Sequence, residues 1–300
     1  MNTNDPQYLK RLYQSWAERM AENPEMGIED MRSLFDEWSK ATTEPEGVTY
    51  KTDQVGGVDV IWTLPVDADS SKVLLFTHGG GFAVGSADSH RKLAGHVAKS
   101  LNATSVVLDY RRAPENPYPA QLEDSVAVYK ALLESGIKPA NITTIGDSAG
   151  GNLAICSVLK YRDLGLPLPG SVIAFSPWID MELSGETLAL NLETDALVSG
   201  EILHGMLDMF IGSSATDNPL VNPLYADLSG FPPLYINAGK VETLLDDARR
   251  VHARATEAGV DTTLSVVDDM QHVFPFMAGR AQKADDEIKK ITLWYNALSS

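Results

Sequence analysis

A serine flanked by small residues and a run of three glycines are the features of this chain best suited to chemistry. Ser148 lies in the sequence Gly-Asp-Ser-Ala-Gly at positions 146–150. A serine hydroxyl becomes a useful nucleophile when a sharp strand-to-helix turn exposes it to a histidine, and flanking glycines let such a turn close. Positions 78–82 read His-Gly-Gly-Gly-Phe, and glycines allow two backbone N–H groups to converge on one oxygen atom. The two motifs predict an activated serine and a site that binds an oxyanion.

The segments around both motifs support this interpretation. The apolar run 72–77 ends at His78, and the run 142–146 leads into Ser148, as expected of buried parallel strands. Apolar residues after the serine recur at helical spacing, which predicts a helix over 148–162. Strand, sharp turn, nucleophile and helix is the order that an activated serine of this kind requires.

A nucleophilic serine needs a histidine that takes its proton and an acid that orients the histidine. His272 is the best candidate for the base, because it follows the predicted strand 263–267 and a turn, and because it comes last in the chain order serine, acid, histidine. The other histidines are expected elsewhere: His78 in the glycine turn, His90 and His96 at the surface or a helix end, His204 in an insertion and His252 on a helix.

The acid is expected in the loop that follows the predicted strand 234–238. Glu242, Asp246 and Asp247 are all candidates there. Glu242 precedes the next helix, whereas Asp246 and Asp247 fall in its first turn, where carboxylates commonly stabilise the helix dipole without any chemistry. We therefore predict that Glu242 is the acid, with Asp246 as its main rival.

Strands and helices alternate along most of the chain, which predicts a mostly parallel sheet covered by helices on both faces. An antiparallel pair near 48–52 and 58–62 comes first, with Gly56-Gly57 in the hairpin. The later predicted strands are 72–77, 104–109, 142–146, 171–176, 234–238 and 263–267, and the predicted helices are 88–100, 118–134, 148–162, a helix through 244–255 and one near 280–298.

Two other segments carry helix signals outside this alternation. Residues 6–40 hold two amphipathic stretches, and residues 180–223 are too long for a plain loop. We predict a single domain over 1–300, with a core from 46–179 and 224–300 and a helical cap from 1–45 and 180–223. Methionine and aromatic side chains of the cap are candidates to line an acyl or alcohol pocket, although ordinary helix packing accounts for most of them.

Composition narrows the partners and cofactors. The 300-residue chain has a formal net charge of −17 and no cluster of lysine and arginine, which argues against nucleic acid and anionic membranes as partners. Nucleotide-binding and metal-binding motifs are missing from the sequence, so we expect no cofactor and no metal. The single cysteine, Cys156, is expected to be a buried small residue. Without a signal-peptide pattern or a membrane-length apolar stretch, we expect a cytoplasmic protein.

Four motifs together resemble the bacterial hormone-sensitive-lipase-like esterases, which have the α/β-hydrolase fold. They are His-Gly-Gly-Gly-Phe at 78–82, Asp-Tyr-Arg-Arg-Ala-Pro-Glu at 109–115, Gly-Asp-Ser-Ala-Gly at 146–150 and Gly-x-x-Glu-x-Leu-x-Asp at 239–246. The resemblance covers nearly the whole chain. It implies an eight-stranded, mostly parallel sheet flanked by helices and topped by a helical cap.

The resemblance also implies site residues. It assigns Ser148, Glu242 and His272 to a catalytic triad, although many members have aspartate at the acid position, which keeps Asp246 open as a rival. It assigns an oxyanion hole to the backbone N–H groups of Gly80, Gly81 and Ala149.

The activity implied is that of a serine carboxylesterase acting on short- to medium-chain esters through an acyl-enzyme. Alternatives with the same triad are a lactone hydrolase of the monoterpene ε-lactone type and a deacetylase. A non-catalytic small-molecule binder, as in the plant gibberellin receptors that share this fold, is more remote, because a pure binder would be expected to lose the base. The expected partners are a small ester or lactone substrate and a second copy of the chain, paired through the edge strand near 263–267.

Overall fold

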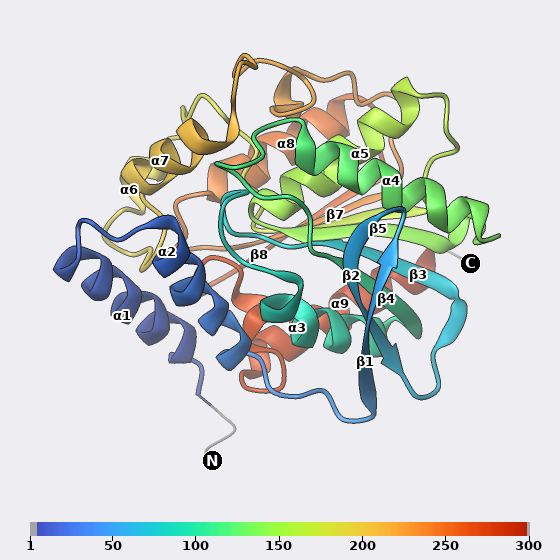
Figure 1. Cartoon of the computed structure of the whole chain (residues 1–300), viewed down its shortest axis with the longest axis horizontal. Coiled ribbons are helices and arrows are strands. Elements are labelled where there is room, and N and C mark those ends of the chain that lie inside the picture. The colour runs from blue at the N-terminus through green and yellow to red at the C-terminus, as the bar shows by residue number, and fades with distance from the viewer. Residues whose placement is uncertain (1–4, 299–300) are drawn as a thin grey trace.

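A computed structural model of the chain describes residues 5–298, and its centre is one eight-stranded sheet (Figure 1). The strands lie in the order β1-β2-β4-β3-β5-β6-β7-β8. The first two pair with each other and with β4 in antiparallel fashion, and all the other pairs are parallel. The strands are β1 (Val48–Val55), β2 (Val58–Pro65), β3 (Asp69–Thr77), β4 (Ala103–Leu108), β5 (Ile142–Asp147), β6 (Ser171–Phe175), β7 (Leu234–Gly239) and β8 (Thr262–Val267).

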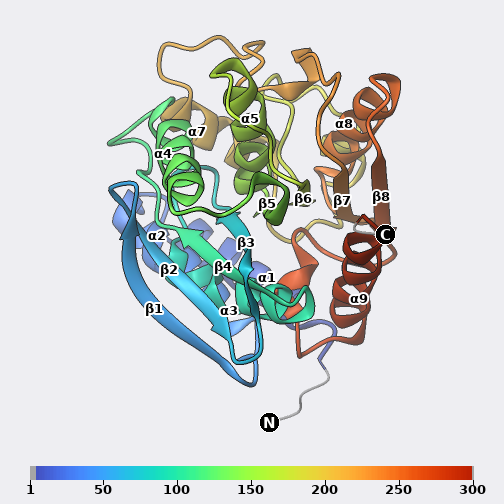
Figure 2. The ribbon, with the colours of Figure 1, turned by 90° about the vertical axis from the view of Figure 1, so that its right-hand side faces the viewer.

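Helices cover both faces of this sheet. Figure 2 shows α3 (Ala87–Ser100) and α9 (Gln282–Ala297) on one face, with α4 (Ala120–Glu134), α5 (Ala149–Asp163) and α8 (Leu245–Glu257) on the other. Because both faces are covered, the central strands do not alternate between buried and exposed residues, and all residues of β4, β5, β6 and β7 are buried. The predicted fold class and the predicted order of strands and helices are confirmed.

The boundaries differ in detail from the sequence prediction. The helix predicted from position 118 begins at Ala120 instead. Pro119 accounts for the difference, since the residue before a proline is disfavoured in helical backbone. Over residues 5–298, none of the helices is both long enough and apolar enough to cross a membrane.

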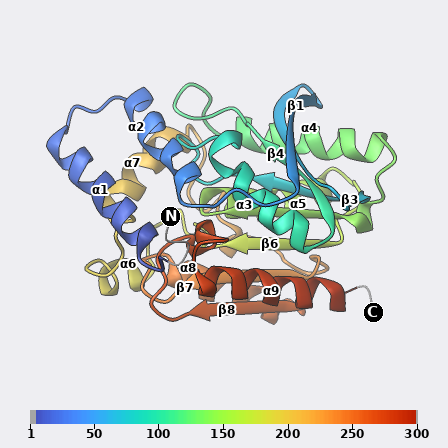
Figure 3. The same ribbon diagram turned by 90° about the horizontal axis from the view of Figure 1, so that it is seen from below.

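The two segments outside the alternation lie side by side at one end of the molecule (Figures 1 and 3). The first contains α1 (Tyr8–Glu22), α2 (Ile28–Phe35) and the 3-10 helix η1 (Asp36–Lys40), and the second contains α6 (Thr187–Leu190) and α7 (Gly200–Phe210). Ser199 caps α7, because its side chain accepts a hydrogen bond from the Ile202 N–H group. In the first segment, Trp16, Phe35 and Trp38 form an aromatic cluster with ring centroids 4.9–5.3 Å apart.

The topology brings the chemistry-bearing residues to one edge of the sheet. The carboxyl ends of parallel strands meet at the same edge, and it is there that loops of α/β sheets form ligand sites. His78 follows β3, Ser148 follows β5, Glu242 follows β7, and His272 lies in the loop beyond β8.

Candidate active site

Ser148 lies on a sharp turn between β5 and α5. Its φ is +52°, a backbone conformation that costs energy for a residue with a side chain and that clusters at functional sites. Close packing forms the turn, since a Cβ atom at Gly150 would overlap the carbonyl group of Thr77. The Thr77 hydroxyl also donates a 2.7 Å hydrogen bond to the Gly150 carbonyl oxygen. The turn therefore fixes Ser148 with its side chain only partly buried.

His272 contacts the Ser148 hydroxyl directly. Its Nε2 atom lies 3.0 Å from the Ser148 Oγ atom, which is a hydrogen-bond distance. The histidine is 2% exposed and comes from the loop after β8, as the sequence predicted. The contact joins residues 124 positions apart, so the sheet topology creates it rather than any local motif.

Glu242 lies on the other side of the imidazole ring. Its Oε2 atom is 3.8 Å from the His272 Nδ1 atom, and the carboxylate is fully buried. The same oxygen accepts hydrogen bonds from the Ser176 hydroxyl at 2.7 Å and from the Gly239 N–H group at 3.0 Å. In the described part of the chain, neither the second carboxylate oxygen nor His272 Nδ1 has a hydrogen-bond partner. Such separations shorten when a substrate is bound, so the distance is compatible with an acid that orients this histidine.

The two rival acids have other roles in the structure. Asp246 accepts a hydrogen bond from the Thr187 N–H group at 3.1 Å and pairs with Arg249 at 3.1 Å. Asp247 is buried and accepts hydrogen bonds from two consecutive N–H groups, those of residues 179 and 180, at 2.7 and 2.8 Å. Both carboxylates thus fasten the segment after β6 to α8, and among the three candidates only Glu242 is paired with His272.

The glycine motif forms a tight loop beside Ser148. Gly80 has a φ of +110°, and a Cβ atom there would overlap the Val84 carbonyl group, so only glycine fits. Within residues 5–298, the N–H groups of Gly80, Gly81 and Ala149 donate no hydrogen bond to other groups of the chain. Three free donors therefore lie on the loop after β3 and at the first turn of α5.

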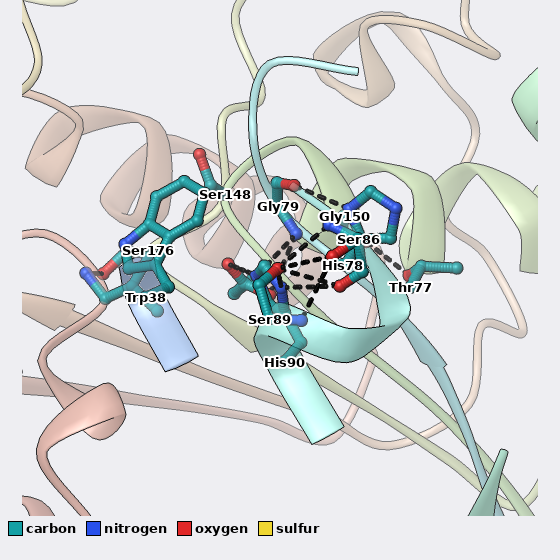
Figure 4. Close-up of polar contacts among 12 residues, drawn as sticks. Trp38, Thr77, His78, Gly79, Ser86, Ser89, His90, Ser148, Gly150 and Ser176 are labelled. Atoms are coloured by element: carbon teal, nitrogen blue, oxygen red, sulfur yellow. Dashed lines mark hydrogen bonds and ion pairs between the residues drawn. The ribbon is translucent and has the colours of Figure 1, made fainter. Parts of the chain in front are cut away.

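A buried network ties this loop to the residue before Ser148. Figure 4 shows Gly79, Ser86, Ser89 and His90, which take part in it. Asp147 accepts a hydrogen bond from the Gly79 N–H group at 3.1 Å, and its other oxygen lies 3.3 Å from His90 Nε2. The Nδ1 atom of His90 contacts the Ser86 carbonyl oxygen at 3.1 Å and the Ser89 hydroxyl at 2.9 Å. His90 was predicted at a surface or helix end. It does lie in the first turn of α3, but it is 0% exposed, so the surface prediction was wrong.

The surroundings of His272 act on its pKa in opposite directions. Burial lowers the pKa of the imidazole, and the nearby carboxylate of Glu242 raises it. The net result is a pKa above the ordinary value of a histidine. An imidazole can take up a proton from the serine hydroxyl and release it later in the same reaction.

A small cavity of about 40 Å³ lies over Ser148 and His272. Both segments outside the alternation of strands and helices contribute to it, with Phe35 and Trp38 from the first and Leu203 and Met206 from the second. The remaining lining residues are Gly80, Gly81, Trp178, Leu197, Val198 and Ile202. A larger groove of about 480 Å³ lies between α4 and α5, but none of the site residues described above lines it.

Several residues around the site were not anticipated from the sequence. Ser176 bonds to Glu242, Asp195 accepts hydrogen bonds from the N–H and hydroxyl groups of Thr243, and Tyr13 donates one to the His272 carbonyl. Ser176 lies at the end of a predicted strand and could have been considered on that ground. Tyr13 is 259 positions from its partner and carries no local signal. No group of three or more His, Cys, Asp or Glu side chains suited to a metal occurs in the part of the chain that the structure describes.

Comparison with known proteins agrees with this geometry. Residues 74–276 match a family model described as the alpha/beta hydrolase fold. An acetyl-hydrolase of Streptomyces hygroscopicus is 38% identical over 73% of this chain and 73% of its own length. The carboxylesterase NlhH of Mycobacterium tuberculosis is 33% identical over 72% of this chain and 70% of its own length.

Solved structures resemble the chain over nearly its full length. A crystal structure of an esterase from the bacterial hormone-sensitive lipase family has a TM-score of 0.93, with 36% identity and 98% coverage of both chains. A hormone-sensitive lipase from a metagenome library has a TM-score of 0.92, with 36% identity and 99% coverage of both chains. The chain is a member of the α/β-hydrolase family. Within that family it belongs to the bacterial hormone-sensitive-lipase-like esterases, as the four motifs indicated.

Proposed function

We propose that Ser148, His272 and Glu242 are the nucleophile, the base and the orienting acid of this carboxylesterase. The Ser148 Oγ atom attacks the ester carbonyl carbon while His272 Nε2 takes the hydroxyl proton. The tetrahedral intermediate collapses, the carbon–oxygen bond to the alcohol breaks, and His272 gives its proton to the leaving oxygen. Water then attacks the acyl-enzyme with His272 again as base, which releases the carboxylic acid and restores Ser148. The 3.0 Å contact between Ser148 and His272 is the observation that carries this proposal.

The negative oxygen of both intermediates is assigned to the N–H groups of Gly80, Gly81 and Ala149. Among the described residues these donors have no hydrogen-bond partner, and they lie on the loop after β3 and at the first turn of α5. Removing one such donor typically costs about 2.7–4 kcal/mol of transition-state stabilisation, so the loop geometry contributes strongly to the rate.

The substrate is proposed to be an ester with a short acyl chain. A free volume of about 40 Å³ leaves little room beyond a few heavy atoms without side-chain movement, and its lining is mostly apolar. Two relatives, from Streptomyces hygroscopicus and Mycobacterium tuberculosis, are named acetyl-hydrolase or putative acetyl-hydrolase. The deacetylase alternative therefore gains support. A cyclic ester would need the same chemistry, and nothing in the site selects for a lactone.

We assign residues 1–45 and 180–223 to a helical cap on a core formed by 46–179 and 224–300. Their described parts together supply Phe35, Trp38, Leu203 and Met206 to the cavity over Ser148. Met206 in particular packs where a side chain at Gly81 would lie, so the cap touches the proposed oxyanion loop.

A homodimer through β8 is the proposed assembly. This strand is at the edge of the sheet and pairs with β7 alone among the strands described, and Val266 on it is 38% exposed. Light scattering after gel filtration would test this proposal, and Val266→Lys is expected to give a monomer because a charge disfavours edge pairing. The cytoplasmic location stays a prediction, and cell fractionation would test it.

The decisive experiment measures initial rates on p-nitrophenyl esters from acetate to palmitate and on one ε-lactone. The proteins compared are wild type, Ser148→Ala, His272→Ala, Glu242→Ala and Asp246→Ala. The proposal expects activity on short esters that is lost with Ser148 and His272, and that depends far more on Glu242 than on Asp246. If folded Ser148→Ala protein is as active as wild type, the assignment of the nucleophile is wrong.

A further inference from the structure

The peptide group that joins His272 to Val273 is held at both of its polar ends. Its carbonyl oxygen accepts a 3.0 Å hydrogen bond from the Tyr13 hydroxyl, and its N–H group donates a 3.0 Å hydrogen bond to the Ser176 hydroxyl oxygen. All four residues are buried. This peptide is the direct main-chain attachment of the proposed base, so its orientation sets where the imidazole lies.

The backbone at this point is strained. Val273 has a φ of +51°, which is rare for a residue with a branched Cβ atom. Such a conformation persists only where the surrounding structure over-determines it. The two hydroxyl contacts supply that restraint, one at each end of the same peptide group.

The Tyr13 hydroxyl is itself fixed in direction. The Trp38 indole N–H group donates a 3.1 Å hydrogen bond to it, so the hydroxyl proton is left to bond the His272 carbonyl. Trp38 also stacks on Phe276 from the same loop, with ring centroids 5.4 Å apart and planes at 7°. Two residues of the N-terminal segment thus hold the histidine loop by both a polar chain and ring packing.

The other end of the peptide leads to the proposed acid. The Ser176 hydroxyl accepts from Val273 and donates its own proton to Glu242 Oε2 at 2.7 Å. The Ser176 hydroxyl therefore connects the main chain next to His272 with the Glu242 carboxylate by hydrogen bonds. Tyr13 and Ser176 restrain the His272 main chain from opposite sides, one from α1 and one from the end of β6.

We propose that Tyr13 is a positioning residue for the ester hydrolysis, and that it acts by fixing the peptide between His272 and Val273 so that His272 Nε2 stays on Ser148. The inference rests on the proposed role of His272 as the base. It gives the N-terminal segment a task in the chemical step that is separate from lining the substrate cavity, since Tyr13 does not line that cavity.

The chain offers a matched control for the loss of this hydroxyl. Tyr129 is also 0% exposed, and its hydroxyl also donates to a backbone carbonyl, that of Pro167, at 2.7 Å. It lies on α4, away from the residues that line the cavity. Tyr129→Phe removes a hydroxyl bond to a main-chain carbonyl, as Tyr13→Phe does, and leaves the site untouched, whereas Tyr13→Phe also removes the acceptor of the Trp38 N–H group.

The test compares the two variants with wild type on p-nitrophenyl acetate. Tyr13→Phe is expected to lower kcat about five- to tenfold, the effect of one lost hydrogen bond, with KM within about twofold of wild type. It should also slow the reaction of Ser148 with a fluorophosphonate probe, because that reaction needs the same base. Tyr129→Phe should leave both rates within about twofold of wild type, although it too loses stability in urea unfolding.

A double substitution tests whether the effect runs through the shared peptide. Because Tyr13 and Ser176 hold the same group, the factor lost in kcat on Tyr13→Phe should differ between the wild-type and Ser176→Ala backgrounds. The inference is overturned if Tyr13→Phe lowers kcat by the same factor in both backgrounds, or if it leaves kcat unchanged. It is also overturned if Tyr129→Phe lowers kcat as much as Tyr13→Phe does. If wild-type protein hydrolyses no ester, the proposed function fails and this inference falls with it. Active wild type with a fully active Tyr13→Phe variant refutes the inference alone.

Discussion

Glu242 and His272 are buried together with Oε2 and Nδ1 3.8 Å apart, and the imidazole bridges from this carboxylate to Ser148. The base must be neutral to accept the serine proton, so activity should rise with pH as His272 loses its proton. Burial acts to lower the pKa of His272, but the carboxylates of Glu242, Asp195 and Asp147 together raise it above the ordinary histidine value. The increase of activity with pH should therefore occur above the ordinary histidine pKa.

Glu242→Gln should move the rising part of the pH–activity curve to lower pH and reduce the activity reached at high pH. The amide lacks the charge that raises the His272 pKa, and it no longer favours the tautomer that presents Nε2 as acceptor to Ser148. We expect kcat to fall by about 100- to 10,000-fold, and the pH dependence of kcat/KM to show the shift. Asp246→Asn is the control, because its carboxylate serves Thr187 and Arg249 instead. If the pH dependence of kcat/KM is the same in Glu242→Gln as in wild type, another group orients the histidine.

Asp147 is predicted to stabilise the loop that carries the proposed oxyanion donors. Its side chain is 0% exposed and contacts both the Gly79 N–H group and His90. Asp147→Ala removes the carboxylate from both contacts and leaves the Gly79 N–H group only its longer 3.3 Å contact with His90 Nε2, which should reduce the free energy of unfolding by about 3–5 kcal/mol. Asp147→Asn should cost less, because its amide oxygen still accepts from Gly79. Urea unfolding measures both, and equal losses would argue against the Gly79 contact.

Met206 is predicted to limit acyl-chain length. It lines the cavity over Ser148 and is 4% exposed. Met206→Ala should raise the ratio of kcat/KM for hexanoate over acetate by at least about fivefold, since each additional buried CH₂ group contributes about 0.8 kcal/mol. Met209→Ala on the same helix is the control, because Met209 does not line the cavity. An unaltered chain-length profile in Met206→Ala would place the limit elsewhere.

The sequence was sufficient to predict the fold and the residues that meet at the site. Ser148, Glu242 and His272 each follow a segment that reads as a strand, and the parallel topology brings the loops after those strands to one edge of the sheet. Local patterns therefore predicted both the strands and the loops that carry the candidate residues.

The supporting contacts could not be predicted in this way. His90 reads as a residue near the start of a helix, but Asp147, Trp38 and Phe276 cover it, and these come from distant parts of the chain. Tyr13 reads as one of several apolar positions on an amphipathic helix, and only the tertiary structure places its hydroxyl on the His272 carbonyl. Packing between distant parts of the chain determines the surroundings of His90 and Tyr13. The periodicity of apolar residues in the sequence does not indicate which distant residue each side chain contacts.

Asp247 is predicted to make the stability of the protein fall as pH rises. Burial raises the pKa of its carboxyl to about 7, although the two N–H groups that it accepts from act in the opposite direction. In the unfolded chain the pKa returns to its ordinary value near 3.8, so between about pH 4 and pH 7 unfolding releases a proton and becomes easier as pH rises. Asp247→Asn cannot ionise, and its amide oxygen can still accept from the N–H groups of residues 179 and 180. The difference in unfolding free energy between variant and wild type should therefore grow by a few kcal/mol in favour of the variant between about pH 4 and about pH 8, as measured by urea unfolding. A difference that stays constant over this range would mean that Asp247 is already ionised in the folded protein at the lower pH.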